Sequence, residues 1–578
     1  MYTDVMTEIA RFKAGRIHVA RAGLATQARL CVDMLQQGRG MAWVVKNRDE
    51  LLTARALMRL FSPELSSGDF LPDALDKGGW TSLPPFSPRS ANREGWTERL
   101  SALYALRSGQ AKGLILTADN LLPKLVPLDF FENREVTLMR GEDVSLDMIL
   151  EQAVAWGYER VSMVSNPGEI ARRGDILDIM PPGYDKPIRL DFFGDLIEEI
   201  RLFDPVSQRS KANLSEVRVL PVSPIRQSPA DQAKMQARWK SLFQKNMLTE
   251  NERFGLTRLQ EQGDFRLLPG CCYDTATNLE AWLPADTVWV LPGLSDFRDM
   301  LSSAERLWTE AFEAQDVEGR PQPQRLAMRE ASDVESACER FACVHAEPLV
   351  MGIAKGIHAL PERSLSSFED LFPSTAEQDR PWQTLVQALK RWQNDKRQTI
   401  LCFASEKSRT KFLNLASQDG LSPLLRYSGE QHGLFALVAP FRAGAELIWD
   451  QSLILGEDLL QPHAEKSRRV PTGAFKGLDR YDELKPGDLL VHRDYGIARF
   501  GGLLRMETGS TANDFLLLHY SGDDRLYVPV DRLSLIQRFK GGGEAQPSLD
   551  RLGGGAWQSG KEKARKAIEK IAEDLIEM

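Results

Sequence analysis

Arg189 and Phe193 are the two side chains whose types and spacing best suit binding to another molecule. They lie in a segment where apolar and polar residues alternate, and the apolar positions share one parity: Ile188, Leu190 and Phe192. If this aliphatic set faces a core, Arg189 and Phe193 project together towards solvent. A cation beside an exposed aromatic ring is typical of a protein-contact surface. The alternative is that Phe193 only closes the end of a hairpin.

Three short strands are predicted around these two residues, because each segment alternates and is bounded by turn residues. The first turn is made by a Pro-Pro-Gly sequence and the second by a Gly-Asp pair. The predicted strands are Asp175–Met180, Pro187–Phe192 and Leu196–Phe203.

Other chemistries find little support in the sequence. The six cysteines form no CxxC pair, so neither a metal site nor a disulfide framework is predicted, and the seven histidines show no catalytic grouping. No apolar run approaches the roughly 20 residues of a membrane span, and the N-terminus has no signal-peptide core. We therefore expect a cytoplasmic chain with no membrane partner.

Size and charge favour a multidomain protein that binds other proteins. The chain has 578 residues, which predicts three to five domains. Its formal net charge is -8, whereas domains that grip nucleic-acid phosphates usually carry a basic excess. Any affinity for DNA is therefore expected to be weak, although local basic patches remain possible.

Residues 164–210 closely resemble the UvrA-binding insertion of the repair protein UvrB and of the transcription-repair coupling factor (Mfd) family. The resemblance implies that Arg173, Arg189 and Phe193 contact UvrA. Arg172 is an additional cation beside them. On this reading, Arg189→Ala should weaken UvrA binding and leave thermal stability nearly unchanged.

A UvrB-like α/β layer would carry a phosphate-binding loop, which needs glycines and a Lys-Ser/Thr pair to hold nucleotide phosphates. The equivalent place is ARAGLATQA (20–28), where Gly23 remains and Gln27 follows, but the lysine pair is missing. Leu291 and Pro292 occupy the positions at which a working nucleotide site would have a magnesium-binding acidic pair. These four residues predict a degenerate nucleotide site with no catalysis, so no ATP or magnesium is expected in this chain.

Residues 485–540 are rich in short strands with Gly, Asn and Asp turns, which predicts a small SH3- or Tudor-like barrel. The segments LLVHRDYGIARFGG and LYVPV resemble the RNA-polymerase-interacting domain shared by the coupling factors and CarD-like regulators. That resemblance places Arg505, Met506 and Glu507 at the contact to the polymerase β subunit. Gly501-Gly502 would bend the backbone and expose a strand edge for pairing with another protein. The alternative is that Met506 fills the barrel core.

The predicted fold class is multidomain α/β and β: a degenerate P-loop-type layer with a β-rich insertion, a small α/β domain, the barrel and a connecting helix. Residues 320–395 are interpreted mainly as connections, and Glu446–Leu455 as one strand. Asn47 is expected to cap a helix that runs to about Phe61, and residues 229–262 and about 405–418 are predicted to be helical. Further strands are predicted at Met41–Val45, Gly113–Thr117, Thr287–Leu291, Thr399–Phe403 and Leu434–Ala439. The predicted parts are UvrB-like layer 1–124, insertion 125–210, second part of the layer 211–345, small α/β domain 346–460, linker 461–484, barrel 485–540, Gly-rich linker 541–556 and helix 557–578.

The resemblance therefore implies an adaptor that binds stalled RNA polymerase, recruits UvrA and is not itself an enzyme. In that family an ATP-dependent DNA translocase motor follows the connecting helix, so we expect this chain to be part of a longer or split protein. One alternative is a UvrB-like ATP-dependent damage-verification protein. Another is a CarD-like transcription regulator.

Overall fold

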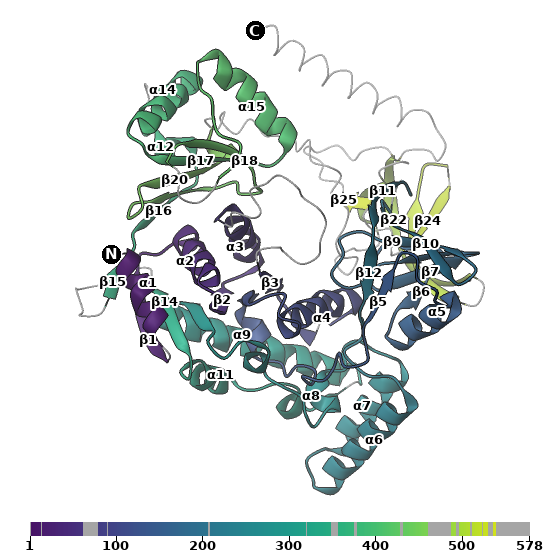
Figure 1. Cartoon of the computed structure of the whole chain (residues 1–578). Coiled ribbons are helices and arrows are strands. Elements are labelled where there is room, and N and C mark those ends of the chain that lie inside the picture. The colour runs from purple at the N-terminus through teal and green to yellow at the C-terminus, as the bar shows by residue number, and fades with distance from the viewer. Residues whose placement is uncertain are drawn as a thin grey trace. The chain divides into compact units, whose positions relative to one another are not determined.

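The structure is a computed structural model, and it divides into two compact units, Met1–His463 and Ala464–Met578 (Figure 1). It describes residues 2–12, 14–61, 79–88, 91–205, 208–319, 321–347, 357–374, 379–427, 432–460, 487–492, 496–508, 511–522, 524–529, 536–538 and 549. The predicted linker 461–484 and connecting helix 557–578 lie outside the described residues, as does all of the Gly-rich linker except residue 549.

A seven-stranded parallel sheet forms the centre of the first unit, with the order β15-β1-β14-β13-β2-β4-β3. The predicted strands near residues 41, 113 and 287 are confirmed as β2, β4 and β13. The strands are β1 Gly15–Ala20, β2 Met41–Val45, β3 Trp80–Leu83, β4 Gly113–Thr117, β13 Val288–Pro292, β14 Ala342–Glu347 and β15 Ile357–Ala359.

Helices cover both faces of this sheet, because its strands are apolar on both sides (Figure 1). Trp43 packs in the core shared with α1, α2 and α3, whereas its neighbour Val44 packs in the core shared with α4, α9 and α11. Asn47 caps α3 by accepting a hydrogen bond from the Glu50 amide at 3.0 Å, as its position before the helix predicts. The helices are α1 Tyr2–Arg11, α2 Leu24–Gln36, α3 Arg48–Phe61, α4 Arg93–Arg107, α9 Leu294–Val317 and α11 Ala331–Cys338.

The insertion folds as a separate six-stranded sheet with the order β11-β10-β9-β8-β7-β6. All pairings are antiparallel except that of β6 with β7, and one face packs on α5 Leu146–Ala155 to form its own core. The two strands β12 Glu216–Val219 and β5 Val136–Met139 pair beside it. The sheet comprises β6 Glu159–Arg160, β7 Glu169–Arg173, β8 Ile176–Ile179, β9 Ile188–Phe193, β10 Leu196–Phe203 and β11 Ser210–Leu214.

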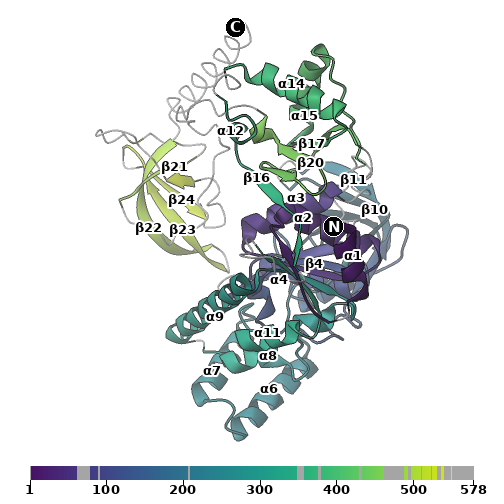
Figure 2. The same ribbon diagram turned by 90° about the vertical axis from the view of Figure 1, so that its left-hand side faces the viewer.

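Helices follow the insertion, as the pattern of residues 229–262 predicts. Figure 2 shows α6 Pro229–Gln244 and α7 Glu250–Glu261 side by side. Both helices begin at hydroxyl N-caps, Ser228 and Thr249, and Thr249 makes a complete capping box with Glu252. The short α8 Pro269–Cys272 and α10 Gln324–Ala327 lead back to the large sheet.

The small α/β part contains a five-stranded mixed sheet with the order β16-β19-β20-β17-β18. The predicted strands near 399 and 434 and the helix from 405 to 418 are confirmed as β17, β18 and α15. One face shares a core with α2 and α3, and the other packs on α12, α14 and α15. The elements are β16 Glu362–Leu365, α12 Phe368–Leu371, α14 Pro381–Asn394, β17 Gln398–Phe403, α15 Glu406–Gln418, β18 Leu434–Val438, β19 Gly444–Leu447 and β20 Ser452–Gly456.

Two sequence predictions are wrong in this region. Residues 320–395 are not mainly connections, since β14 lies between β1 and β13 within the large sheet. Glu446–Leu455 is not one strand but the hairpin of β19 and β20. The chain turns there at Gln451, which has a left-handed φ of 53°.

The described residues of the second unit form a five-stranded antiparallel sheet with the order β24-β23-β22-β21-β25. No pairing between β24 and β25 closes this sheet within the described residues. Its strands are β21 Leu489–His492, β22 Gly496–Thr508, β23 Thr511–His519, β24 Arg525–Pro529 and β25 Ile536–Arg538. Across the part of the chain that the structure describes, no helix is long and apolar enough to cross a membrane.

Candidate functional site

Phe193 stands at the end of the β9–β10 hairpin with 75% of its surface exposed. The strand alternates as predicted: Ile188, Leu190 and Phe192 are buried, and the opposite parity faces outwards. Gly194 makes the tight turn with a φ of 62°. The exposure argues against the alternative that Phe193 packs to close the hairpin, because so exposed a ring contributes little to a core.

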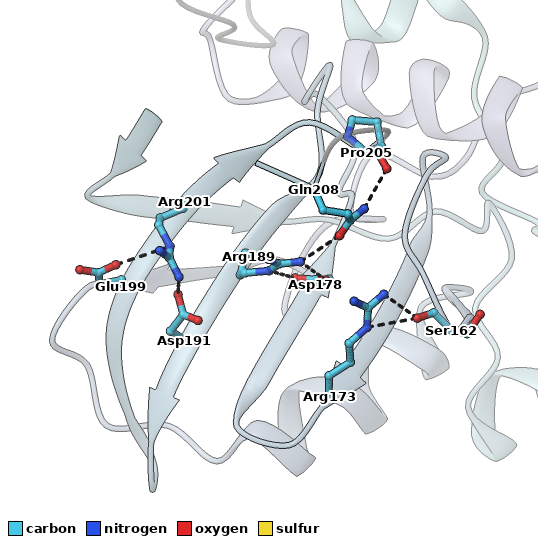
Figure 3. Close-up of polar contacts among 9 residues, drawn as sticks. All are labelled: Ser162, Arg173, Asp178, Arg189, Asp191, Glu199, Arg201, Pro205 and Gln208. Atoms are coloured by element: carbon cyan, nitrogen blue, oxygen red, sulfur yellow. Dashed lines mark hydrogen bonds and ion pairs between the residues drawn. The ribbon is translucent and has the colours of Figure 1, made fainter. Parts of the chain in front are cut away.

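Arg189 does not project into solvent, which corrects the prediction that it stands free beside Phe193. Its guanidinium makes two parallel hydrogen bonds to Asp178, from Nε at 2.7 Å and Nη2 at 2.8 Å (Figure 3). Nη2 also reaches Gln208, and the group lies 4.5 Å from the centre of the Phe203 ring. The Asp178 side chain is 1% exposed and that of Arg189 16%. Hydrogen bonding to Asp178 raises the pKa of Arg189 above its ordinary value.

Arg173 is the more available cation of the pair. It is exposed on β7, and its Nε and Nη2 donate to the Ser162 carbonyl at 3.2 and 2.8 Å (Figure 3). No carboxylate among the described residues forms an ion pair with it. Arg172 has the opposite parity and instead pairs with Asp147 at the start of α5. Arg173 therefore keeps its charge on the outer face, whereas Arg172 does not share that face.

Further charged side chains lie on the same face of the sheet. Arg201 of β10 bonds Asp191 of β9 and lies 3.5 Å from Glu199 (Figure 3). We call Arg173, Asp191, Phe193, Glu199 and Arg201 the docking face. Arg173 and Phe193 are predicted from the sequence, whereas Asp191, Glu199 and Arg201 are not, although Glu199 and Arg201 show the same alternation that identifies Arg189.

The predicted degenerate nucleotide site is occupied by a carboxylate of the protein itself. Gly23 caps α2 directly after β1, and the Glu362 carboxylate accepts hydrogen bonds from the Ala25 and Thr26 amides at 3.3 and 2.7 Å. A helix N-terminus is where a phosphate would otherwise bind. A Cβ on Gly23 would lie 2.4 Å from this carboxylate, so the glycine makes room for it.

The other three predicted residues are committed to internal contacts. Gln27 donates to the Ala22 carbonyl and accepts from the Trp43 indole, each at 2.9 Å. Leu291 is buried in β13, and the Pro292 carbonyl accepts a hydrogen bond from His345 at 3.0 Å. Within the described ranges no group of His, Cys, Asp and Glu side chains could hold a metal ion.

The residues predicted to contact the polymerase, Arg505, Met506 and Glu507, lie on β22. Only their backbone is described, and their side chains lie outside the described part of the structure. Along 503–507, β22 pairs with β23, whereas β21 pairs only with 496–499. No strand within the described residues pairs with the other edge of 503–507. The register breaks at Gly501, and Gly502 has a φ of 128°. The predicted bend and strand edge are thus present in the backbone.

Comparisons with known proteins agree with this layout. The model of the UvrB interaction domain matches residues 136–224, and that of the CarD-like/TRCF RID domain matches residues 484–540. The transcription-repair-coupling factor of Myxococcus xanthus is 29% identical over 538 residues, covering 86% of this chain and 43% of the relative. That of Escherichia coli is 28% identical, covering 86% and 44%, and that of Staphylococcus aureus is 25% identical, covering 83% and 42%.

Over most of its length the chain is similar to the transcription-repair-coupling factors. It spans less than half the length of the curated relatives it matches. The docking face lies within the matched UvrB interaction domain, and the β22 edge lies within the matched CarD-like/TRCF RID domain.

Proposed function

We propose that this chain is an adaptor that binds the RNA polymerase β subunit through the β22 edge and UvrA through the docking face, coupling arrested transcription to excision repair. The observation that carries the proposal is the exposed Phe193, with the exposed Arg173 on the same face of the sheet, inside the matched UvrB interaction domain. Large exposed aromatic rings beside cations are the residue types that dominate interface energies.

The roles of the side chains follow from their surroundings. Phe193 would supply the apolar anchor. Its ring is already exposed, so a partner could bury it without first displacing other side chains. Arg173 would pair with an acidic group of UvrA, because no described carboxylate neutralises it. Arg189 would act by holding the sheet that presents Phe193. On β22, Met506 would make the apolar contact between Arg505 and Glu507.

We further infer that the large sheet is a P-loop-type layer that has lost its nucleotide, and that the second unit closes as an SH3- or Tudor-like barrel. The entry of α2 directly after β1 and the Glu362 carboxylate at its first amides support the first point. The five-strand order supports the second. ATP hydrolysis and DNA translocation would then reside in residues beyond this chain, and this part would need neither ATP nor magnesium.

A reciprocal binding experiment tests the adaptor. Phe193→Ala should weaken UvrA binding by about tenfold or more, since a buried aromatic anchor contributes about 2 kcal/mol. It should leave binding to a polymerase β fragment unchanged. Met506→Asp should do the reverse, because a buried charge at a β-augmentation edge opposes pairing.

The matched control is Phe254→Ala, which removes an aromatic side chain 64% exposed on α7, far in sequence from the docking face. It should change neither affinity. Calorimetric titration of each variant against UvrA and against the polymerase fragment gives both affinities. Loss of UvrA binding in Phe254→Ala, or its retention in Phe193→Ala, would reject the docking face.

A further inference from the structure

A cavity of about 620 Å³ opens beside α11, far from both proposed contact surfaces in the sequence. Its size lies in the range of small-ligand sites. Four of the side chains lining it are cationic and one is acidic: Lys124, Arg325, Arg329, Arg340 and Asp333. This local excess stands out in a chain whose formal net charge is -8.

The carboxylates that balance two of these cations are not part of the cavity lining. Arg325 pairs with Glu252 at 2.7 Å, and Arg329 pairs with Glu280 at 2.6 Å. Lys124 and Arg340 have no ion-pair partner among the residues that the structure describes. The cavity therefore presents two cations that form no ion pair within the described residues, two cations that are already paired outside the lining, and one carboxylate, Asp333.

Arg329 is the only buried cation of the four that line the cavity. Its side chain is 7% exposed, Nε donates to the Leu121 carbonyl at 2.9 Å and Nη1 is held by Glu280. The remaining nitrogen, Nη2, and Glu280 Oε2 of the same ion pair are buried, and neither has a hydrogen-bond partner among the described residues. Arg329 therefore fixes one side of the lining through a buried ion pair, and the exposed Arg325 and Arg340, with the half-buried Lys124, carry the donors that a ligand can reach.

The backbone holds these groups in place. The segments around Pro123 and Met328 pair as an antiparallel bridge, with the Lys124 amide bonded to the Ala327 carbonyl at 2.9 Å. The Arg329 amide bonds the Leu122 carbonyl at 3.0 Å. Lys124 and Arg329 thus lie on two segments that are held by hydrogen bonds to each other, and Arg340 directly follows α11. Because the backbone of all three is already fixed, little conformational entropy of the backbone is lost when a ligand binds.

The lining also indicates the chemical class of the ligand. Asn278 and Ser336 add neutral donors, and none of the described residues lining the cavity is aromatic. A nucleobase would lack a ring on which to stack. Phosphate oxygens suit a set of guanidinium, ammonium and hydroxyl donors. We propose that this cavity binds a phosphate-bearing anion, either a free phosphorylated small molecule or a backbone phosphate of nucleic acid.

Titration of the whole chain with pyrophosphate tests the proposal. The wild type should bind saturably, and the double variant Lys124→Gln with Arg340→Gln should bind at least tenfold more weakly. The matched control is Lys390→Gln with Lys411→Gln, which removes the same two charges from exposed positions on α14 and α15. Arg340→Gln alone, at an exposed position, serves if the double variant fails to fold.

A second arm separates the two sources of phosphate. If nucleic acid is the ligand, binding to a short duplex should weaken in the double variant, and the slope of log K against log salt should fall by about 2. If a small molecule is the ligand, pyrophosphate binding alone should respond. Equal behaviour of the double variant, the control and the wild type towards both probes would overturn the site. UvrA and polymerase binding should be unchanged throughout, so this test is independent of the adaptor proposal.

Discussion

At the scale of single residues, the Arg189–Asp178 pair shows how a side chain suited to recognition can instead support the sheet. Asp178 is almost fully buried, so its charge depends on Arg189 for compensation. Removing Arg189 leaves an unpaired buried carboxylate, and this changes what a binding experiment with that variant would mean. Weaker UvrA binding by such a variant would report damage to the sheet as well as any lost contact.

We expect Arg189→Ala to lower the free energy of unfolding by about 3 kcal/mol, the usual cost of breaking a buried pair from one side. Arg201→Ala is the control on the neighbouring strand, because its partners Asp191 and Glu199 are more exposed, and it should cost about 1 kcal/mol or less. Urea unfolding at neutral pH measures both. Equal midpoints for the two variants would contradict the structural role of Arg189.

Glu362 is a second residue whose surroundings change its chemistry, because they set the pKa of its carboxyl group. Burial raises the pKa of its carboxyl above the usual value and outweighs the hydrogen bonds from the Thr26 and Ala25 amides. Because the folded pKa lies above the unfolded one, its contribution to stability is complete below the unfolded pKa. It is lost as the pH rises through the folded pKa.

The variant Glu362→Gln should therefore gain stability relative to the wild type as the pH rises from about 4 to 7, since the two are nearly isosteric when Glu362 is protonated. Denaturant unfolding of both proteins across that range measures the difference and cancels all other titrating groups. A difference that stays constant, or that falls with rising pH, would show that the amides of α2 dominate over burial.

The alternation of β9 predicted the burial of Leu190 and the exposure of Phe193, because period-two parity depends only on which face meets a core. Parity does not reveal cross-strand neighbours. Asp178 lies opposite Arg189 only through the register of β8 on β9, which no local pattern encodes. Glu362 is likewise far in sequence from the helix that it caps, so its contact could not be read locally.

At the scale of elements, the predictable strands are those with continuous apolar runs between turn residues, such as β2 and β4. The strand β14 was missed because His345 and Glu347 interrupt its apolar pattern. His345 bonds the Pro292 carbonyl, and Glu347 accepts a hydrogen bond from His18 at 3.1 Å. These polar residues are satisfied by neighbouring strands, which a single segment cannot show.

The bend in β22 depends on its two glycines. A Cβ at Gly501 would lie 2.5 Å from the His519 ring, and Gly502 has a backbone conformation that other residues rarely adopt. We expect Gly502→Ala to lower the stability of the second unit by about 1–2 kcal/mol. It should also weaken polymerase binding, because the edge from Leu503 would point elsewhere.

Circular dichroism melting of the chain with Gly502→Ala, followed by titration with the polymerase β fragment, checks both effects. UvrA binding should remain at the wild-type level, since that surface belongs to the other unit. Wild-type melting together with wild-type polymerase affinity would mean that the bend does not require glycine.

At the scale of the whole molecule, the first unit is held together where a nucleotide site is predicted from the sequence. Trp449 of the small α/β part stacks on Tyr2 at 4.3 Å and donates to the Thr26 hydroxyl at 3.0 Å. Ile400 and Phe435 share one buried core with α2 and α3. Motifs in the sequence indicate the two segments that the family models match, 136–224 and 484–540. They do not indicate this shared core, because it joins segments that carry no recognisable motif.

The strand order of the large sheet also constrains the timing of folding. β1 is flanked by β14 and β15, so residues near the start of the chain pair with residues beyond 341. At a synthesis rate of about 5–20 residues per second, the ribosome needs roughly 20–70 s to make the intervening segment. During that interval the apolar strand β1 has neither neighbour, and the nascent chain must be shielded from aggregation. The six-stranded sheet of the insertion has a core built from one continuous stretch of sequence. It can therefore fold before β13, the central strand of the large sheet, has been synthesised.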